Sequence, residues 1–526
     1  MSMLNDDSVL NGAVGEGESG ETGAAARTWS PMQEEVFRDV SGGAGHTVVR
    51  ARAGSGKTTT ILEALRHVGR GLTVLFVAFN KSIATELERR APAGVEVRTM
   101  HAYGLRQCSR RWGKVRIDSN RAEGLVRAVV GYRPETAELR KMLVKAVSLS
   151  KGSLARTADD VDALCDAFGI DVEQDGLGSR EEFVADVLRV LEWCKDPFIQ
   201  AQPKSARQNE VWVTFRSNEA AIDFDDMVWL PVVNDVRCWQ FDRVFVDETQ
   251  DLNAAQIALA LRACKPQGRI LAVGDDKQGI YRFRGADSQA LDNVVRELRA
   301  RVLPLSITYR CAKSIVAVAN TVVPDLEAAP GAPDGIVREV GEKEMIRDAR
   351  EGDFILSRTN APLVRLCLAL LRDGRKANIQ GKDIGVQLAS FVRKSKCKTI
   401  EALRDYTEKW CEREVARMFK KDQATDTSAV EDRAATILVL AEQCSSVAEL
   451  LGNIEKLFSD SDPTGKIILS TTHKAKGLER EKVWVLADTY MRRGRGDREP
   501  AQEEKNLWYV AVTRAKLELV LVRGVK

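Results

Sequence analysis

The chain has 526 residues, more than one hydrophobic core usually serves, so we expect two to four domains. Its formal net charge is only +3, because 79 Lys and Arg are nearly balanced by 76 Asp and Glu, and any polyanion-binding surface must therefore come from local patches. Ten scattered Cys without a C-x-x-C pair, and only 4 His, argue against structural zinc, an iron–sulfur cluster or a disulfide framework. The scattered cysteines favour a reducing compartment, and no apolar run approaches membrane-spanning length, so we expect a cytoplasmic protein that contacts no membrane.

The start of the chain is rich in Gly, Ala, Glu and Ser, and we expect residues 1–27 to be a disordered tail. Order is expected from Trp29, because Ser30 suits a helix N-cap and Pro31 the first helical position. Gln33 follows the cap by three residues, the spacing of a capping box, and its amide could also recognise the edge of an adenine. These two roles do not exclude each other.

Residues 51–58 are the most informative stretch and read Ala-Arg-Ala-Gly-Ser-Gly-Lys-Thr. They follow an apolar run and precede a helical pattern over residues 59–68. A strand that turns through small residues into a helix directs backbone N–H groups and the positive end of the helix dipole at one point, which predicts a phosphate-binding loop, or P-loop. Lys57 is placed to reach the β- and γ-phosphates, and the Thr58 hydroxyl to hold Mg²⁺. The residues expected to bind a nucleoside triphosphate are Ala53, Gly54, Ser55, Gly56, Lys57, Thr58 and Thr59.

A second motif follows a buried strand pattern over residues 241–246 and reads Asp-Glu-Thr-Gln-Asp from Asp247. In P-loop enzymes a carboxylate at this point holds Mg²⁺, so Asp247 is the second expected metal ligand. Glu248 is placed to orient and deprotonate an attacking water. Together the two motifs predict hydrolysis of the triphosphate, with catalysis supplied mainly by positioning and charge stabilisation.

Several further segments occur in a fixed order, and with the two motifs above they resemble the UvrD/Rep/PcrA family of superfamily 1 helicases. The matching segments are residues 75–81 (motif Ia), 99–103 (Ic), 222–227 (the "DFDDL" segment), 273–286 (III), 305–310 (IV), 470–479 (V) and 503–516 (VI). Within the family, the Ala-Phe-Asn-Lys-Ser-Ile-Ala form of motif Ia is most similar to the F-box DNA helicases. The chain departs from the pattern at Ala51, where Gly is usual, and at Phe283, where relatives usually carry Trp.

The resemblance implies ATP as the nucleotide and gives roles to five residues. Gln278 should touch the γ-phosphate and report hydrolysis to the nucleic-acid side. Arg310 and Arg514 should be arginine fingers that offset charge on the transferring phosphoryl group. Tyr309 should stack on the adenine, and Glu479 should bind the ribose.

The resemblance also implies single-stranded DNA contacts from motifs Ia, Ic, III and V. Asn80 is the candidate in motif Ia, and Tyr281 and Phe283 are the candidates for stacking on bases. His101 and His473 either contact phosphate or base, or are satisfied core histidines.

The patterns predict a strand before the P-loop, a strand end that contains Lys81, the strand before Asp247 and a strand over residues 271–273, separated by helical patterns. This alternation predicts an α/β fold with parallel sheets. The resemblance implies two RecA-like αβα P-loop domains, 1A and 2A, with ATP in the cleft between them and mainly helical inserts, 1B and 2B. The expected boundaries are 28–104 and 236–300 for 1A, 105–235 for 1B, 301–373 and 464–526 for 2A, and 374–463 for a reduced 2B.

The leading hypothesis is an ATP-dependent DNA helicase that moves 3′→5′ on single-stranded DNA and unwinds duplex in repair, recombination or defence. Two alternatives are an ATPase motor subunit whose nuclease lies on another chain, and a DNA-gated switch that displaces proteins without processive unwinding. The expected partners are single-stranded DNA, junctions with duplex and, under the first alternative, such a nuclease.

The first half of the expected 2B insert is basic, and it either contacts duplex or a protein partner, or is a solvated face. Its cations are Arg393, Lys394, Lys396, Lys398, Arg404, Lys409, Arg413, Arg417, Lys420 and Lys421.

Overall fold

The computed structural model describes residues 28–173, 176–205, 208–280, 290–421, 427–442, 444–458, 465–490 and 502–525. The chain forms two compact units. The N-terminal unit comprises Trp29–Arg52 and Gly56–Leu305, and the C-terminal unit comprises Ala53–Ser55 and the chain from Ser306 onward. The expected tail, residues 1–27, lies outside the described residues. Within the described ranges, no helix combines the length and the apolar character needed to cross a membrane.

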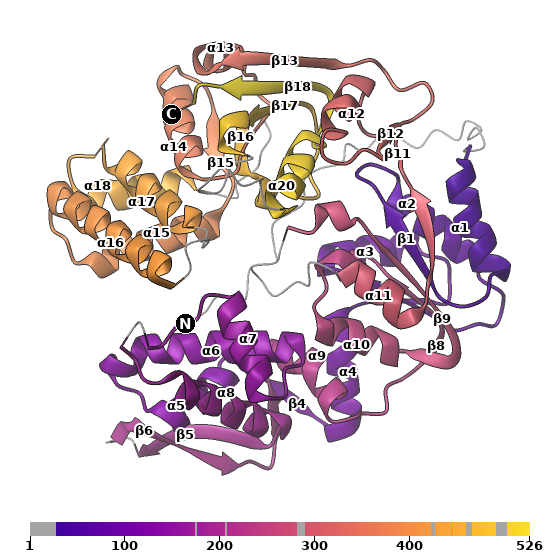
Figure 1. Ribbon diagram of the computed structural model, residues 1–526, viewed down its shortest axis with the longest axis horizontal. Helices are drawn as coiled ribbons and strands as arrows, with labels where there is room; N and C mark the ends of the chain where they lie inside the picture. The colour runs from indigo at the N-terminus through magenta and orange to yellow at the C-terminus, as the bar shows by residue number, and fades with distance from the viewer. Residues whose placement is uncertain are drawn as a thin grey trace. The chain divides into compact units, whose positions relative to one another are not determined.

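The N-terminal unit is built on a six-stranded sheet in the order β10-β1-β9-β8-β2-β3 (Figure 1). Every pair of neighbouring strands is parallel. The strands are β1 (Thr47–Ala51), β2 (Val74–Ala78), β3 (Val95–Thr99), β8 (Phe241–Val246), β9 (Cys264–Gly274) and β10 (Arg301–Leu305). The strand expected over residues 241–246 therefore has the predicted bounds.

Alternate residues of these strands supply two hydrophobic cores, one on each face of the sheet, because successive side chains of a strand point to opposite faces. On β2, Phe76 packs in one core, whereas Leu75 and Val77 pack in the other. The first core is covered by α1 (Pro31–Gly42), α2 (Lys57–Arg66) and α3 (Lys81–Arg90). The second is covered by α4 (Met100–Trp112), α9 (Phe224–Val233), α10 (Ala254–Arg262) and α11 (Ala290–Leu298). The expected αβα arrangement is confirmed.

Two helices begin where the sequence patterns did not place them. Helix α2 starts at Lys57 rather than at residue 59, because Gly56 in a left-handed conformation is already its N-cap. The prediction that Lys81 lies at a strand end is wrong. Strand β2 ends at Ala78, and the Asn80 side chain caps α3 by accepting a hydrogen bond from Ile83 N–H at 2.9 Å.

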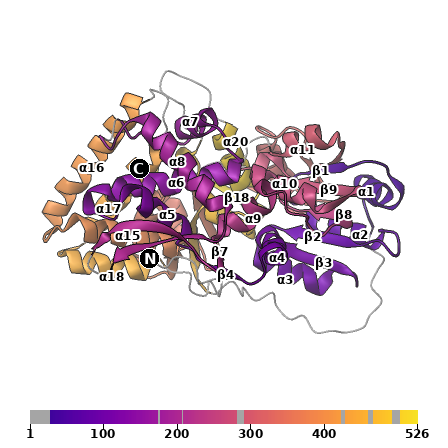
Figure 2. The same cartoon turned by 90° about the horizontal axis from the view of Figure 1, so that it is seen from below.

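A mainly helical insert lies between α4 and α9 and has its own hydrophobic core. Its elements are β4 (Val115–Ile117), α5 (Arg121–Val130), η1 (Pro134–Thr136), α6 (Ala137–Ser153), α7 (Ala158–Ala167), α8 (Arg180–Lys195), β5 (Ile199–Ser205), β6 (Gln208–Arg216) and β7 (Ala220–Ile222). Strands β4 and β7 pair in parallel where the insert leaves and rejoins the αβα layers (Figure 2). Buried Asp226 of α9 pairs with Arg121 at 2.6 Å and with Lys151 at 2.8 Å. Acids of the 222–227 segment thus fix the insert to α9.

The C-terminal unit contains a second six-stranded parallel sheet, in the order β13-β18-β17-β14-β16-β15. Its strands are β13 (Ile336–Gly341), β14 (Phe354–Ser357), β15 (Ala377–Ile379), β16 (Ile467–Thr471), β17 (Arg480–Leu486) and β18 (Ala515–Arg523). A short parallel pair, β11 (Ile307–Thr308) and β12 (Glu327–Ala328), precedes it. The helices around this sheet are α12 (Lys313–Ala319), α13 (Glu342–Asp348), α14 (Ala361–Arg372), α19 (Thr472–Ala475), α20 (Gln502–Val512) and the short η5 (Ala487–Thr489).

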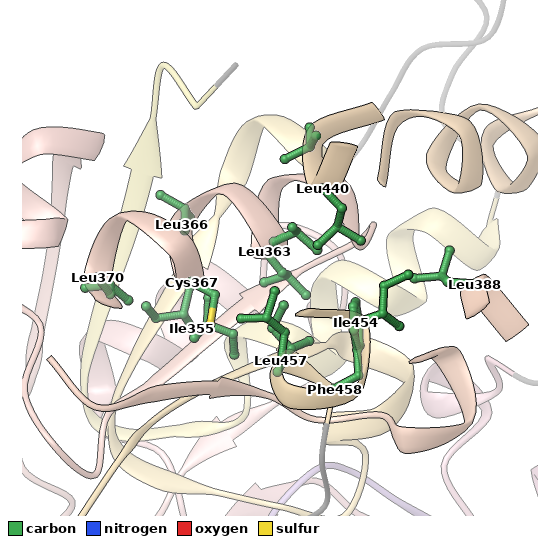
Figure 3. Close-up of a cluster of buried hydrophobic side chains, with 14 of the residues drawn as sticks. Ile355, Leu363, Leu366, Cys367, Leu370, Leu388, Leu440, Ile454, Leu457 and Phe458 are labelled. Atoms are coloured by element: carbon green, nitrogen blue, oxygen red, sulfur yellow. The ribbon is translucent and has the colours of Figure 1, made fainter. Parts of the chain in front are cut away.

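Four further helices follow β15 and lie beside α14 (Figure 1). They are α15 (Lys382–Ser395), α16 (Ile400–Lys421), α17 (Ser428–Ala441) and α18 (Val447–Leu457). Figure 3 shows that Leu388, Leu440 and Ile454 of these helices meet Leu363 of α14 and Ile355 of β14 in one buried cluster. The second helical insert therefore shares its core with the C-terminal sheet.

Candidate nucleotide-binding and catalytic site

The P-loop has the backbone that its glycines predict. Gly54 and Gly56 adopt left-handed conformations, with φ of +73° and +74°. A Cβ at Gly54 would also overlap the side chains of Thr308 and Arg310, so only glycine fits there. Ser55 Oγ is buried without a hydrogen-bond partner among the described residues. A buried hydroxyl in this state is suited to an incoming polar ligand such as phosphate.

The ammonium group of Lys57 lies among the acids of the second motif. It forms a hydrogen-bonded ion pair with Glu248 and lies 3.4 Å from Asp247 Oδ1. Burial alone would lower the pKa of Lys57, but the charges of Asp247 and Glu248 raise it above its ordinary value. Burial raises the pKa of Asp247, and Lys57 opposes that rise. The structure therefore brings together three residues that the sequence analysis assigned to catalysis and metal binding.

Glu248 is held in an unusual conformation. Its backbone has φ +50° and ψ +40°, a left-handed geometry that costs a residue with a side chain about 1–3 kcal/mol. One carboxylate oxygen pairs with Lys57, and the other accepts a hydrogen bond from Gln250 Nε2. This backbone geometry brings the carboxylate to the P-loop lysine, which fits the role of a catalytic base.

Gln250 connects this acidic motif to the segment that follows β9. Its Oε1 accepts a hydrogen bond from Asp275 N–H at 3.1 Å. Gly274 leaves room for this amide, because a Cβ there would overlap Gln250 Oε1. Asp275 in turn accepts from Gln278 Nε2 at 2.7 Å. Hydrogen bonds thus run from Glu248 to Gln278, the residue expected to sense the γ-phosphate.

A second cation, Arg52, reaches the segment after β9 from the P-loop. Its Nη1 donates to Asp275 Oδ1 at 3.1 Å and to Asp276 Oδ1 at 2.8 Å. Burial raises the pKa of Asp275, and the Arg52 charge opposes that rise. Sequence reasoning passed over Arg52, Gln250 and Asp275. All three residues lie inside segments that match the family, which was a signal available in the sequence. Their contacts with one another depend on the order of β1, β9 and β8 in the sheet, which the sequence does not show.

Gln33 completes the expected capping box at the start of α1. Ser30 Oγ accepts from Gln33 N–H at 3.3 Å, and Gln33 Oε1 accepts from Ser30 N–H at 3.0 Å. The Gln33 amide also donates to Thr60 Oγ1 of α2 at 2.8 Å. The capping role is confirmed. Recognition of adenine by the same amide stays a prediction.

In the C-terminal unit, three predicted segments meet around Glu479. One carboxylate oxygen lies 2.5 Å from Arg310 Nε and the other 3.2 Å from Lys516 Nζ. Burial would raise the pKa of Glu479, but these two cations lower it below its ordinary value. Arg310 also donates to Thr513 O at 3.3 Å. Segments 305–310, 470–479 and 503–516 therefore form one polar cluster, as their shared assignment to ATP chemistry requires.

Arg514 is buried in the same cluster, with only 1% of its surface exposed. Its guanidinium donates to Val510 O, to Leu478 O and to Thr513 Oγ1, and among the described residues no carboxylate lies within ion-pair distance. Burial, assisted by the Arg310 charge, lowers the pKa of Arg514 to about 9, so it remains protonated at neutral pH. An unbalanced buried cation is suited to binding an anion.

Residues 53–55 of the P-loop pack within the C-terminal unit. Gly54 O accepts a hydrogen bond from Tyr309 N–H, and Ala53 N–H donates to the Tyr509 hydroxyl, both at 2.8 Å. The Tyr309 ring is half exposed, as a stacking surface for a base would need to be. Tyr509 was not predicted, although its place in segment 503–516 could have indicated it.

The expected DNA contacts differ in how far the structure describes them. Tyr281 and Phe283 lie outside the described residues. Asn80 is exposed, and its carbonyl oxygen caps α3. Burial lowers the pKa of His101 below its ordinary value, and the charge of Asp225 opposes that change. His473 is half-buried in α19. The DNA-binding roles of all five stay predictions.

Comparison with known families decides where the chain belongs. The family model of the UvrD/REP helicase N-terminal domain matches residues 30–298, more than half of the chain. The chain belongs to the UvrD/REP helicase family. The family model of the UvrD-like helicase C-terminal domain matches residues 386–524. The predicted resemblance is therefore confirmed.

Individual relatives are distant. The chain is 26% identical to F-box DNA helicase protein 1 of Schizosaccharomyces pombe over 90% of its own length and 55% of that protein. It is 26% identical to ATP-dependent DNA helicase UvrD2 of Mycobacterium tuberculosis, over 91% of its length and 76% of that protein. It is 25% identical to ATP-dependent DNA helicase Rep of Escherichia coli, over 56% of its length and 43% of that protein. The chain thus spans about half the length of several relatives.

The pairing of Glu248 with Lys57 leads to a prediction about turnover. We expect Glu248→Gln to retain ATP binding, because the amide preserves shape, but to slow hydrolysis by about 10²–10⁴-fold through loss of a general base. Nucleotide binding is measured by equilibrium titration and turnover by phosphate release. Lys57→Ala, which removes the P-loop ammonium, is the control expected to lose hydrolysis altogether. Wild-type turnover by Glu248→Gln would contradict the assignment.

Proposed function

We propose that this chain is an ATP-dependent DNA helicase that moves 3′→5′ along single-stranded DNA and separates duplex. The observation that carries the proposal is the cluster of Lys57, Asp247 and Glu248, joined by hydrogen bonds to Gln278, in a member of the UvrD/REP helicase family. A cluster of this kind suits phosphate binding, water activation and sensing of the γ-phosphate.

Hydrolysis would begin with a change of partners at Lys57. Backbone N–H groups of the P-loop and the Lys57 ammonium would bind the β- and γ-phosphates, in competition with Glu248. Glu248, no longer neutralised by the ammonium, could then accept a proton from the attacking water. Arg514 and Arg310 would stabilise the negative charge that develops on the phosphoryl group.

Asp247 and Thr58 would hold Mg²⁺, which neutralises charge on the phosphate oxygens. The residues fit this ion. Asp247 is a carboxylate with 2% of its surface exposed, so it needs a cation nearby, and here Lys57 supplies that charge from 3.4 Å. Once phosphates engage Lys57, a divalent cation could compensate Asp247 instead.

Gln278 would pass the state of the γ-phosphate to the DNA. It stands three residues before Tyr281 and five before Phe283, the expected stacking residues. A movement of the short helix η3 (Asp276–Gln278) on hydrolysis would be passed along the chain to those two residues, and from them to the bound DNA strand. Such a step would couple translocation to ATP hydrolysis, while the proposed direction of movement rests on family likeness alone.

Direction is tested with tailed duplexes. We expect a duplex with a 3′ single-stranded tail to be unwound and one with a 5′ tail to stay intact, measured by strand release with a blunt duplex as the control. Equal or faster unwinding from the 5′ tail would contradict the proposed polarity. If neither substrate is unwound while DNA still stimulates ATP hydrolysis, the two alternatives, a DNA-gated switch or an ATPase motor subunit, would be favoured. Capture of a nuclease as a partner would then select the motor subunit.

The second helical insert offers a candidate surface for duplex. Its basic surface, defined here as Arg393, Lys394, Lys396 and Lys398, lies at the end of α15 and before α16, and all four side chains are exposed. Among the described residues only Arg393 of these four forms an ion pair, at 3.3 Å from Glu455. Cations without acidic partners are suited to phosphate contacts that release counterions.

Neutralising these four residues to Gln should weaken binding to junctions with a duplex arm. The log–log salt dependence should flatten by roughly 0.9 for each duplex phosphate that the variant no longer neutralises, because fewer counterions are released. ATPase on saturating short single strands should stay nearly unchanged. A matched variant neutralises four other exposed cations of the same unit, Lys343, Arg347, Arg365 and Lys376. An unchanged slope in the first variant would leave protein docking or simple solvation as the better interpretation.

A further inference from the structure

Arg52 occupies the second position of the P-loop, but its contacts are with β10 and with the acids after β9. Its backbone continues the sheet, because its N–H donates to Leu305 O of β10 at 2.8 Å. Only 8% of its surface is exposed. The guanidinium extends to the acids after β9, 3.1 Å from Asp275 Oδ1 and 2.8 Å from Asp276 Oδ1. Arg52 thus joins the P-loop strand to the segment that carries Gln278.

Asp275 contacts three residues of this network: Arg52, Gln250 and Gln278. One oxygen faces Arg52, the other accepts from Gln278 Nε2 at 2.7 Å, and the backbone N–H donates to Gln250. A carboxylate held from one side by a guanidinium has a fixed orientation, since charge-assisted hydrogen bonds are short and strong. Its second oxygen then fixes the amide of Gln278.

We propose that Arg52 is a positioning residue that orients Gln278 through Asp275. In this way it would link the P-loop to the stimulation of ATP hydrolysis by single-stranded DNA. The inference rests on the proposed function, because Gln278 is taken as the γ-phosphate sensor. In this inference Arg52 is not a reacting group. It acts by holding a carboxylate that holds the sensor.

A purely structural ion pair is the competing explanation, and a double-mutant cycle separates the two. We expect Arg52→Gln to lower the kcat of ATP hydrolysis with saturating single-stranded oligothymidylate by about 10–100-fold, the scale of a slightly misplaced group, with little change in KM for ATP. If Arg52 acts through Gln278, the double variant Arg52→Gln/Gln278→Ala should be no slower than Gln278→Ala alone. Independent structural damage would instead multiply the two effects.

Controls make the outcome specific. Arg50→Gln is the matched variant, because Arg50 lies on β1 two residues before Arg52 and pairs with Asp292 on a more exposed surface outside the motifs. It should hydrolyse ATP at the wild-type rate. Arg52→Lys keeps the positive charge but loses the planar guanidinium, so its kcat should lie between those of the wild-type protein and Arg52→Gln. If Arg52→Gln does not fold, Arg52→Lys replaces it in the double-mutant cycle.

Two results would overturn the inference: a wild-type kcat in Arg52→Gln, or multiplied effects in the double variant while the wild-type protein is clearly stimulated by the oligothymidylate. Failure of the wild-type protein to be stimulated at all would overturn the proposed function together with this inference. The two failures are therefore distinguishable in one set of measurements.

Discussion

Burial of two carboxylates at the ends of neighbouring strands is the constraint on which the N-terminal site depends. Asp247 follows β8 and Asp275 follows β9, and each has only 2% of its surface exposed. Removing the partner of a buried charge costs about 3–5 kcal/mol, so each acid needs a cation close by. Lys57 and Arg52 supply those charges. Arg52 directly follows β1, the strand next to β9, and Lys57 is the first residue of α2, the helix after the P-loop turn. A ligand that engages the P-loop must therefore disturb the acids as well.

The C-terminal unit presents the opposite imbalance. Arg514 is a buried cation whose partners are carbonyl and hydroxyl oxygens, and Arg310 shares its carboxylate, Glu479, with Lys516. Such a cluster is suited to negative charge. The second helical insert shares one core with this sheet, so the basic surface beside α15 is tied to the sheet rather than carried on a separate body.

The sequence predicted the two parallel sheets because their strands are apolar runs that end in recognisable motifs, as at residues 241–246 before Asp247. It also predicted the capping box at Ser30 and Gln33, which depends only on local spacing. It misplaced Lys81, because β2 ends at Ala78 and Asn80 caps α3, so that Lys81 is the first residue of a helix rather than part of a strand end. It also missed the joining roles of Arg52, Gln250 and Asp275. Those roles arise from the order of β1, β9 and β8 in the sheet. That order brings Arg52 to Asp275, 223 positions later in the sequence, and Gln250 to Asp275, 25 positions later, and neither pairing leaves a local pattern.

We propose that nucleotide and DNA are linked through the hydrogen bonds that run from Lys57 and Glu248, by way of Gln250 and Asp275, to Gln278. Two binding titrations test this link without catalysis. In the first, the Kd of a labelled oligothymidylate is measured with and without a saturating non-hydrolysable ATP analogue. In the second, the Kd of the analogue is measured with and without saturating oligothymidylate. Coupling between sites typically amounts to about 5–150-fold and must be equal in both directions. The account predicts a factor in that range, the same in both titrations, and one that vanishes in Gln278→Ala. A factor of one in the wild-type protein, with both ligands bound, would contradict it.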